Sequence, residues 1–206
     1  YESVNLASDG SNWVLFAAAR VDKSLCQGRL TLTSGTAVTT ANVTAAATLY
    51  FTPYQGDCIA LYDAGTKWQE FTFAEISLAL VVSSGVNYDV FAYNNAGVVT
   101  LETTSWSDDT TRATALVLQN GVYVKTGATT RRYLGTIRGS AANQVEDSFT
   151  KRFVWNYYNR IQRVLRAFET TDSWTYTTAT WRQANGAGGT LKAEAVIGVA
   201  EVIVAL

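Results

Sequence analysis

The chain has 206 residues, of which 48% are hydrophobic and only 16% are charged, so it can bury a sizeable core but has few charges to keep copies apart. Soluble domains carry roughly 25% charged residues. This composition predicts extended contact with other copies or with another protein surface. Sixteen basic and seventeen acidic residues give a net charge of −1, which provides no overall attraction to nucleic acid or an anionic membrane.

The sequence contains no histidine, which removes the commonest general base and the commonest metal ligand. It also lacks a G-x-S-x-G nucleophile elbow and a glycine-rich phosphate loop. The adjacent acids Glu146-Asp147 and Asp108-Asp109 could in principle form a glycosidase pair, but their polar neighbours favour turn formers or solvated charges. We therefore predict no enzyme activity, no catalytic residues, no metal site and no cofactor.

Cys26 and Cys58 are too few for a disulfide framework and form no metal-binding pair, so packed thiols are predicted. The longest apolar run, residues 193–206, is interrupted by two glutamates and a glycine and is shorter than the roughly 18–20 residues that cross a bilayer. No membrane insertion is expected. The chain starts without a methionine, and we expect it to be the C-terminal piece of a longer protein.

The N-terminal segment ends in residues 14–19, Val-Leu-Phe-Ala-Ala-Ala, which would place apolar side chains on both faces of a strand. A lone surface strand could not hide both faces from water, whereas a neighbouring copy could cover one. The residues predicted to form this interface are Trp13, Leu15 and Phe16.

Composition changes near Gly28, where a threonine-rich pattern begins. Short runs rich in Val, Thr, Tyr and Phe, bounded by Gly, Asn and Asp, recur about every 8 to 12 residues, which is typical of sandwiches and barrels. We therefore predict an all-β fold. An antiparallel β-sandwich of jelly-roll type is expected over residues 28–206, preceded by the end of an N-terminal β shaft over residues 1–27.

Three hairpins are predicted. Two of them join residues 58–62 to 67–73 and residues 88–93 to 98–103, through loops whose residues tolerate positive φ. The third joins residues 115–119 to 122–125 through Asn-Gly, the dipeptide that fits a type I′ turn.

Two segments allow both helix and strand. Residues 74–80 fit one or two helical turns or an alternating strand, and residues 153–168 carry apolar stripes of either period. β-Branched and aromatic residues favour a strand at the start of the second segment. Residues 139–144 and 185–189 are predicted to be loops.

Positive charge gathers in the second half of the chain, at Lys125, Arg131, Arg132 and Arg138. These residues are expected to form a solvated strand edge that resists the addition of another strand. The alternative is a set of ion pairs with Glu146 and Asp147 of a neighbouring copy.

Aromatic residues make up 12% of the chain, and they are expected mainly in the core and in subunit contacts. One group, however, is interleaved with polar residues that can hydrogen-bond sugar hydroxyls while the rings stack on the apolar sugar face. This candidate carbohydrate-binding face consists of Trp174, Tyr176, Trp181, Arg182, Gln183 and Asn185.

The C-terminal residues 196–206 are also apolar on both faces of a strand. Such a strand should be central in a sheet or sealed against another subunit. The residues predicted to form an interface here are Val202, Ile203 and Val204.

Residues 8–13 read Ser-Asp-Gly-Ser-Asn-Trp and resemble the S-D-G-x-N-W segment found at the end of β-structured shafts in tailed-phage fibre proteins. Residues 28–33, 50–54, 59–63 and 173–185 are similar to a module that recurs in virion structural proteins of tailed bacteriophages. The resemblance covers nearly the whole chain and brings no catalytic residues with it. It implies a homotrimer with a β-rich distal domain.

The first functional hypothesis is therefore a fibre or spike module on the head or tail of a virion, which contacts other virion proteins and attaches to a host surface, with a host surface glycan as a candidate ligand. The second is a capsid decoration (cement) protein. A polysaccharide depolymerase is the third, although it would normally need a longer repetitive β-structure.

Overall fold

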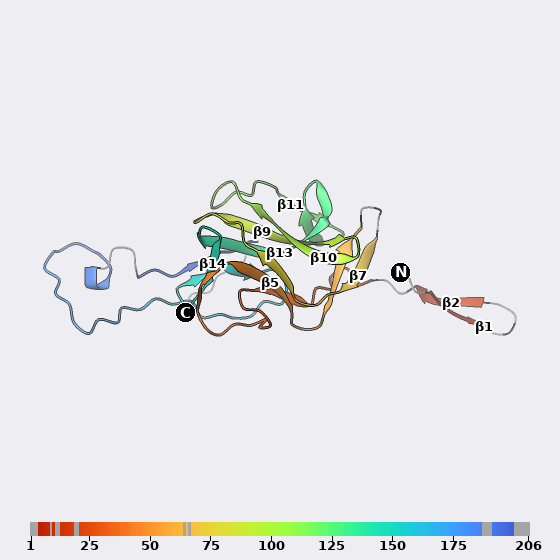
Figure 1. Ribbon diagram of the computed structural model, residues 1–206, viewed down its shortest axis with the longest axis horizontal. Coiled ribbons are helices and arrows are strands. Elements are labelled where there is room, and N and C mark those ends of the chain that lie inside the picture. The colour runs from red at the N-terminus through yellow and green to blue at the C-terminus, as the bar shows by residue number, and fades with distance from the viewer. Residues whose placement is uncertain are drawn as a thin grey trace.

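Figure 1 shows an elongated molecule with packed β-sheets at its centre. The computed structural model describes residues 4–8, 10, 13–18, 21–63, 65, 67–186 and 191–199, and of residues 4–8 and 13–18 it describes the backbone. The described residues form strands and one short 3-10 turn, η1 (Ala184–Gly186), with no α-helix among them. Within this part of the chain, no helix has the length and apolar character needed to cross a membrane.

The strands pair in several antiparallel sheets, with one short parallel pairing near the C-terminus. Their bounds are β1 (Val4–Ser8), β2 (Trp13–Ala18), β3 (Gly28–Thr31), β4 (Val43–Ala46), β5 (Thr48–Pro53), β6 (Cys58–Tyr62), β7 (Trp68–Thr72), β8 (Ile76–Ala79), β9 (Asn87–Asn95), β10 (Val98–Ser105), β11 (Leu116–Gln119), β12 (Val122–Lys125), β13 (Ala128–Ala141), β14 (Gln144–Asp147), β15 (Lys151–Arg152), β16 (Val154–Asn156) and β17 (Glu194–Ala195). The predicted all-β class is confirmed, and the packed sheets are consistent with a β-sandwich, called the sandwich below.

Strands β9 and β13 form the middle of the sandwich and pair with each other along most of their length. Successive side chains of a strand point to opposite faces, and here both faces are buried. Val90 and Leu134 belong to one apolar cluster, whereas their neighbours Phe91 and Tyr133 belong to a second. The first cluster is completed by β3, β5 and β6, and the second by Trp155 and the C-terminal segment around Val196.

The three predicted hairpins are confirmed as β6–β7, β9–β10 and β11–β12. Their turns follow from local chemistry. Asn120 and Gly121 have φ values of 54° and 89°, and Ala96 and Gly97 have values of 51° and 96°. Positive φ at both central positions is the signature of a type I′ turn, whose twist matches the paired strands. The second turn is thus tighter than the four-residue loop expected from the sequence.

The segments left open by the sequence are resolved in favour of strands. Residues 76–79 form β8, which pairs with β5, so the helical alternative for residues 74–80 is wrong. Residues 154–156 form β16, but no regular structure follows up to residue 168, so the strand prediction holds only at the start of that segment. The predicted loop at residues 139–144 is instead the end of β13 and a tight turn into β14.

The predicted boundary at Gly28 coincides with the start of β3, although the preceding residues also contact the sandwich. Cys26 is buried, and the Leu25 carbonyl accepts a hydrogen bond of 2.9 Å from the Ala60 amide. β1 and β2 pair with each other and lie beyond one end of the sandwich in Figure 1. The predicted interface residues Trp13, Leu15 and Phe16 are on β2, whereas Val202, Ile203 and Val204 lie outside the described residues.

Arg132, on β13, fixes the segment that enters the sandwich. Its side chain is fully buried, and its guanidinium donates hydrogen bonds to the carbonyls of Lys23, Ser24 and Ala60 at 3.0, 2.9 and 2.6 Å. The guanidinium carbon also lies 4.6 Å from the ring centroid of Tyr158. The expectation of a solvated edge is therefore wrong for Arg132, which serves as an internal hydrogen-bond donor.

Replacing Arg132 with methionine should lower the free energy of unfolding by about 3 kcal/mol, because three carbonyls lose their donor, the Ala60 carbonyl in a fully buried place. Urea denaturation measures this change, and limited proteolysis should then cut within residues 21–25. The matched control is Arg131→Met. Arg131 is half-buried and pairs with Glu102 near the surface, so its loss should cost less than about 1 kcal/mol. Equal effects of the two substitutions would contradict the anchor role of Arg132.

Both cysteines are free, with Cys26 buried and Cys58 half-buried, so a packed thiol is confirmed for Cys26. Burial raises the pKa of the Cys26 thiol to about 11 and that of Tyr158 to about 12. Burial also raises the pKa of Tyr133. The folded protein therefore holds these protons more tightly than the unfolded chain does, where the pKa values are near 9 and 10.

We expect the stability contributed by these neutral groups to be complete below about pH 9 and to be lost as the pH rises toward 12, because unfolding then allows them to ionise. Urea midpoints measured between pH 8 and pH 11.5 should fall steadily. A Tyr158→Phe variant, which has no hydroxyl to ionise at that position, should show a smaller fall above pH 10. A midpoint that stays constant across this range would refute the expectation.

Candidate ligand-binding surface

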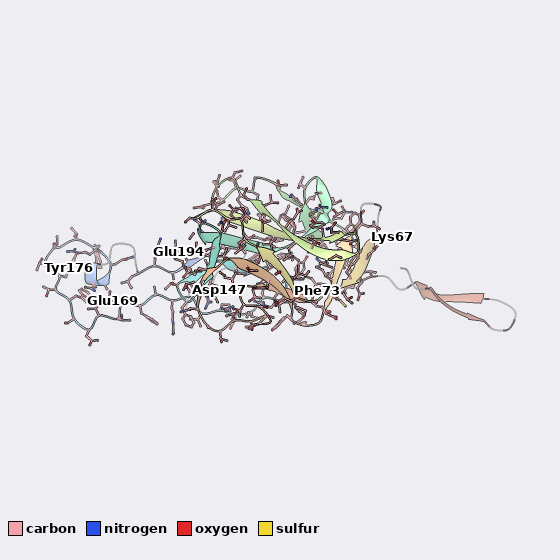
Figure 2. All side chains as sticks on the ribbon, viewed as in Figure 1. Lys67, Phe73, Asp147, Glu169, Tyr176 and Glu194 are labelled. Atoms are coloured by element: carbon pink, nitrogen blue, oxygen red, sulfur yellow. The ribbon has the colours of Figure 1, made fainter. Side chains whose placement is uncertain are left out.

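The candidate carbohydrate-binding residues lie on a segment that projects from the sandwich, called the aromatic loop below (residues 169–186). Figure 2 shows its labelled residues Glu169 and Tyr176 at one extremity of the molecule, whereas Lys67 lies near the other end of the sandwich. Residues 170–182 are all exposed. The loop is therefore presented to solvent and does not contribute to the core.

The aromatic loop leaves and re-enters the sandwich at neighbouring points. Before the loop, the Arg166 amide donates to the Phe149 carbonyl at 2.7 Å; after it, the Glu194 amide donates to the Thr150 carbonyl at 2.8 Å. The Arg152 side chain reinforces the departing segment by donating two hydrogen bonds, of 2.9 and 2.8 Å, to the Val164 carbonyl. Both ends of the loop are thus held by consecutive residues of one turn.

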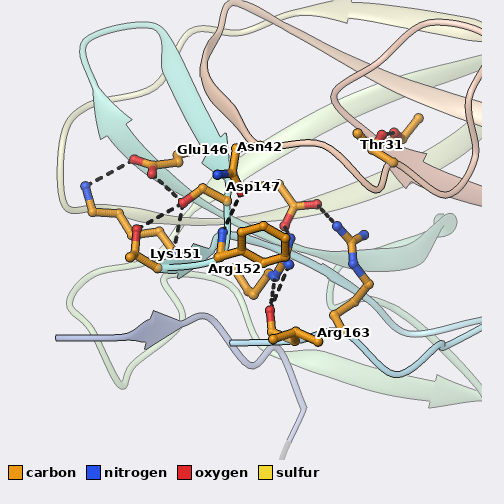
Figure 3. Close-up of polar contacts among 12 residues, drawn as sticks. Thr31, Asn42, Glu146, Asp147, Lys151, Arg152 and Arg163 are labelled. Atoms are coloured by element: carbon orange, nitrogen blue, oxygen red, sulfur yellow. Dashed lines mark hydrogen bonds and ion pairs between the residues drawn. The ribbon is translucent and has the colours of Figure 1, made fainter. Parts of the chain in front are cut away.

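Ion pairs strengthen this base, as Figure 3 shows. Asp147 lies between Arg152 and Arg163, at 2.9 and 3.2 Å. Glu146 pairs with Lys151 at 3.1 Å and accepts a hydrogen bond of 2.6 Å from Ser148 Oγ. Both acids are buried, which corrects the expectation that they are solvated or that they pair with a neighbouring copy.

The other charged residues singled out in the sequence also have partners in the same chain. Lys125 and Arg131 pair with Glu102, and Arg138 pairs with Asp109. Asp108 accepts hydrogen bonds of 2.8 Å from the amides of Thr110 and Thr111, so its predicted role as a turn former is confirmed. These acids are committed to structural contacts.

Hydrogen bonds within the aromatic loop connect it to itself and to the returning chain. Glu169 accepts from the Thr171 amide at 2.8 Å, and the Thr171 hydroxyl accepts from Asn185 Nδ2 at 3.1 Å. The Gln183 side chain exchanges two hydrogen bonds of 3.2 Å with the backbone of Leu191. These contacts close the loop without using the sandwich.

The loop encloses a concave surface with a volume of about 570 Å³, within the range of roughly 300–1,000 Å³ typical of small-molecule sites. Its lining is predominantly apolar. Of the predicted residues, Trp174, Tyr176, Trp181, Arg182 and Gln183 line this surface, together with Thr180. The sixth, Asn185, lies on η1 and bonds to Thr171 instead.

Three aromatic side chains of this surface are open to solvent, with exposed fractions of 46% for Trp174, 40% for Tyr176 and 104% for Trp181. Fully exposed tryptophan is costly in water, because it leaves a large apolar area uncovered. Exposed rings gathered around one concavity are typical of a binding site. The alternative expectation, that aromatics serve the core, holds for Trp155 and Tyr133 and not for these residues.

The charge on this surface comes from Arg182. Its guanidinium carbon lies 4.1 Å from the ring centroid of Tyr176, close enough for a cation–π contact. The Tyr176 hydroxyl is 3.4 Å from Thr180 Oγ1. The hydrogen bond to Thr180 and the neighbouring Arg182 guanidinium lower the pKa of Tyr176.

The groups that line this surface are suited to noncovalent contacts with a ligand. The lining offers aromatic faces, a hydroxyl, an amide and a guanidinium, and it includes no carboxylate of the kind that glycoside hydrolysis uses in pairs. Among the described residues, no group of three or more Cys, Asp or Glu side chains is placed to hold a metal ion.

Sequence reasoning missed the base of the loop and the way the chain returns to the sandwich. Val196 is buried against Tyr133 and Trp155, and the Gly198 carbonyl accepts a hydrogen bond from Arg112, which also pairs with the buried Asp89 at 2.6 Å. A side chain at Gly198 would overlap Tyr133 Oη and Thr136 Oγ1. In the sequence, the glycine at position 198 could have indicated that the returning chain passes close to the sandwich.

The chain matches no protein-family model, no curated protein and no solved structure.

Deleting residues 169–191 and closing the gap with a short Gly-Ser turn should leave the sandwich folded, because both ends of the loop are already held side by side. The free energy of unfolding should change by no more than about 1 kcal/mol, since most of the described residues that are removed are exposed and loop closure depends only weakly on length. Urea denaturation followed by circular dichroism measures it.

The control for this deletion is Trp155→Ala within the sandwich, which should cost about 3 kcal/mol because Trp155 packs against Tyr133 and Tyr157. A deletion variant that is less stable than Trp155→Ala would mean that the loop is part of the folding unit.

Proposed function

We propose that this chain is a non-enzymatic surface module of a bacteriophage virion fibre, which assembles as a homotrimer and attaches the virion to a host surface. One observation carries the proposal: the β1–β2 pair and the aromatic loop lie at opposite ends of the sandwich (Figure 1). The end that carries β1 and β2, called the mounting end below, is free to join the rest of the fibre, and the end that carries the aromatic loop is free to contact the host. This polarity agrees with the resemblance of residues 8–13 to the end of a phage fibre shaft.

The mounting end needs partners. β1 pairs with β2 in a sheet of their own, and an isolated two-stranded hairpin is marginally stable in water. The sequence of residues 14–19 is apolar at every position, so a strand of this composition gains most when both faces are covered. Neighbouring copies in a trimer would provide that cover, with Trp13, Leu15 and Phe16 as the interface residues and Val202, Ile203 and Val204 as the second set.

The opposite end is suited to a ligand that is partly apolar and partly polar. Sugar rings have this character, because their C–H faces stack on aromatic rings while their hydroxyls take part in hydrogen bonds. Trp174 and Trp181 offer the faces, and the Thr180 hydroxyl offers hydrogen bonding. We therefore propose a host surface glycan as the ligand, with other virion proteins as partners at the mounting end.

A non-enzymatic role is supported by what the acidic residues do. A glycosidase needs two carboxyl groups that flank the substrate. Glu146 and Asp147 are instead buried in ion pairs beneath the loop, and Asp108 caps a turn. These three acids are therefore not among the residues that line the concave surface of the aromatic loop.

Size-exclusion chromatography with light scattering tests the assembly. We expect three chains per particle for the full chain and a weaker assembly, with monomers present, for a variant that lacks residues 1–18, because the deletion removes one of the two proposed interface sets and leaves the sandwich core intact. A full chain that elutes as a stable monomer would refute the trimer.

Electron microscopy of virions that carry this chain, labelled at its C-terminus, tests the location. Label on projecting fibres supports the proposal. Label spread over the capsid shell would favour a decoration protein instead.

A further inference from the structure

We propose that the aromatic loop selects a sugar that bears a carboxylate, and that Arg182 is the residue that recognises the charge. This inference rests on the proposed function, since it names the ligand class of the same surface. It is carried by the position of one guanidinium among exposed aromatic rings.

The Arg182 side chain is held in place before any ligand arrives. Its guanidinium carbon stacks 4.1 Å from the Tyr176 ring centroid on one side. Gly186 lies nearby on η1 with a φ of 61°, and a Cβ at that position would be 3.7 Å from Arg182 Nη1. A guanidinium stacked on a ring keeps its N–H edge available, and this edge matches the two oxygens of a carboxylate.

The position of Arg182 distinguishes it from the other arginines. Among the described residues, carboxylates pair with Arg112, Arg131, Arg138, Arg152 and Arg163. These ion pairs include neither Arg182 nor Arg29, Arg132 and Arg166, and of these four arginines it is Arg182 that lines the concave surface. The lining of the concave surface also contains no acid. An anionic ligand is therefore favoured over a neutral one.

The neighbouring tryptophan supplies the second half of the recognition. Trp181 is adjacent to Arg182 in the chain and is fully exposed. An indole face can stack on the C–H face of a pyranose, while a carboxylate at the edge of the same ring takes the N–H donors of the arginine. A uronic or nonulosonic acid presents both features within one residue, and a neutral hexose presents only the first.

A binding array tests this assignment when each uronic-acid-containing oligosaccharide is printed beside its carboxyl-reduced counterpart, in which CH₂OH replaces the carboxylate. We expect the full chain to bind at least one acidic member about tenfold more tightly than its reduced partner, as a charge-assisted hydrogen bond at a partly exposed site would give. This preference should shrink as sodium chloride is raised from 50 to 500 mM.

Two variants separate the contributions. Arg182→Gln should bring the acidic member down to the affinity of its reduced partner and leave the reduced partner unchanged. Trp181→Ala should weaken both members. Both side chains are exposed, so the variants should keep the circular dichroism spectrum and urea midpoint of the parent chain.

The outcomes distinguish the two levels of inference. Equal binding of acidic and reduced members, unaffected by Arg182→Gln but lost in Trp181→Ala, would overturn the carboxylate assignment and leave glycan attachment standing. Binding to neither member of any pair would overturn both the carboxylate assignment and the attachment role of the loop. Neither outcome would bear on the proposed trimer, which light scattering tests separately.

Discussion

Strand β13 is the constraint on which the rest of the sandwich depends. It is buried on both faces, and it pairs with β9, β12, β14 and β16 along different parts of its length. Such crowding requires two glycines: a Cβ at Gly135 would overlap the Trp155 carbonyl, and one at Gly139 would overlap the carbonyl of Ser83. The close passage of these segments, and hence the position of the turn that bears the aromatic loop, follows from the absence of side chains at two positions of one strand.

Several of the chain's charged side chains hold the sandwich together from within. Arg132 holds three carbonyls from within, and the Asp89–Arg112 pair joins the middle sheet to the returning C-terminal segment. Burying such groups costs desolvation energy, which their hydrogen bonds and ion pairs offset in part; Arg132 Nε is buried without a hydrogen-bond partner among the described residues. Other guanidiniums stack on rings at the surface, Arg166 on Phe149 and Phe168 and Arg182 on Tyr176 among them.

Elements governed by local chemistry could be predicted from the sequence. The hairpins followed from Asn-Gly and similar turns, and the aromatic residues of the loop were recognised because rings and polar residues alternate there without a core pattern. Residues 153–168 could not be predicted, because their apolar residues fit two periods equally well and the real segment leaves β16 after three residues. The roles of Glu146 and Asp147 depend on Arg152 and Arg163, and this pairing arises only when β14, β15 and the departing chain meet. The sequence near each of these residues does not indicate that the three segments come together.

The two ends of the aromatic loop are held next to each other by the carbonyls of Phe149 and Thr150. The packing of the sandwich therefore depends little on the sequence between these two points. Substitutions, insertions or wholesale exchange of sequence between those anchor points would leave the core unaffected. Under the proposed attachment role, such an architecture would allow the ligand-binding sequence to change while the folding of the core stays the same.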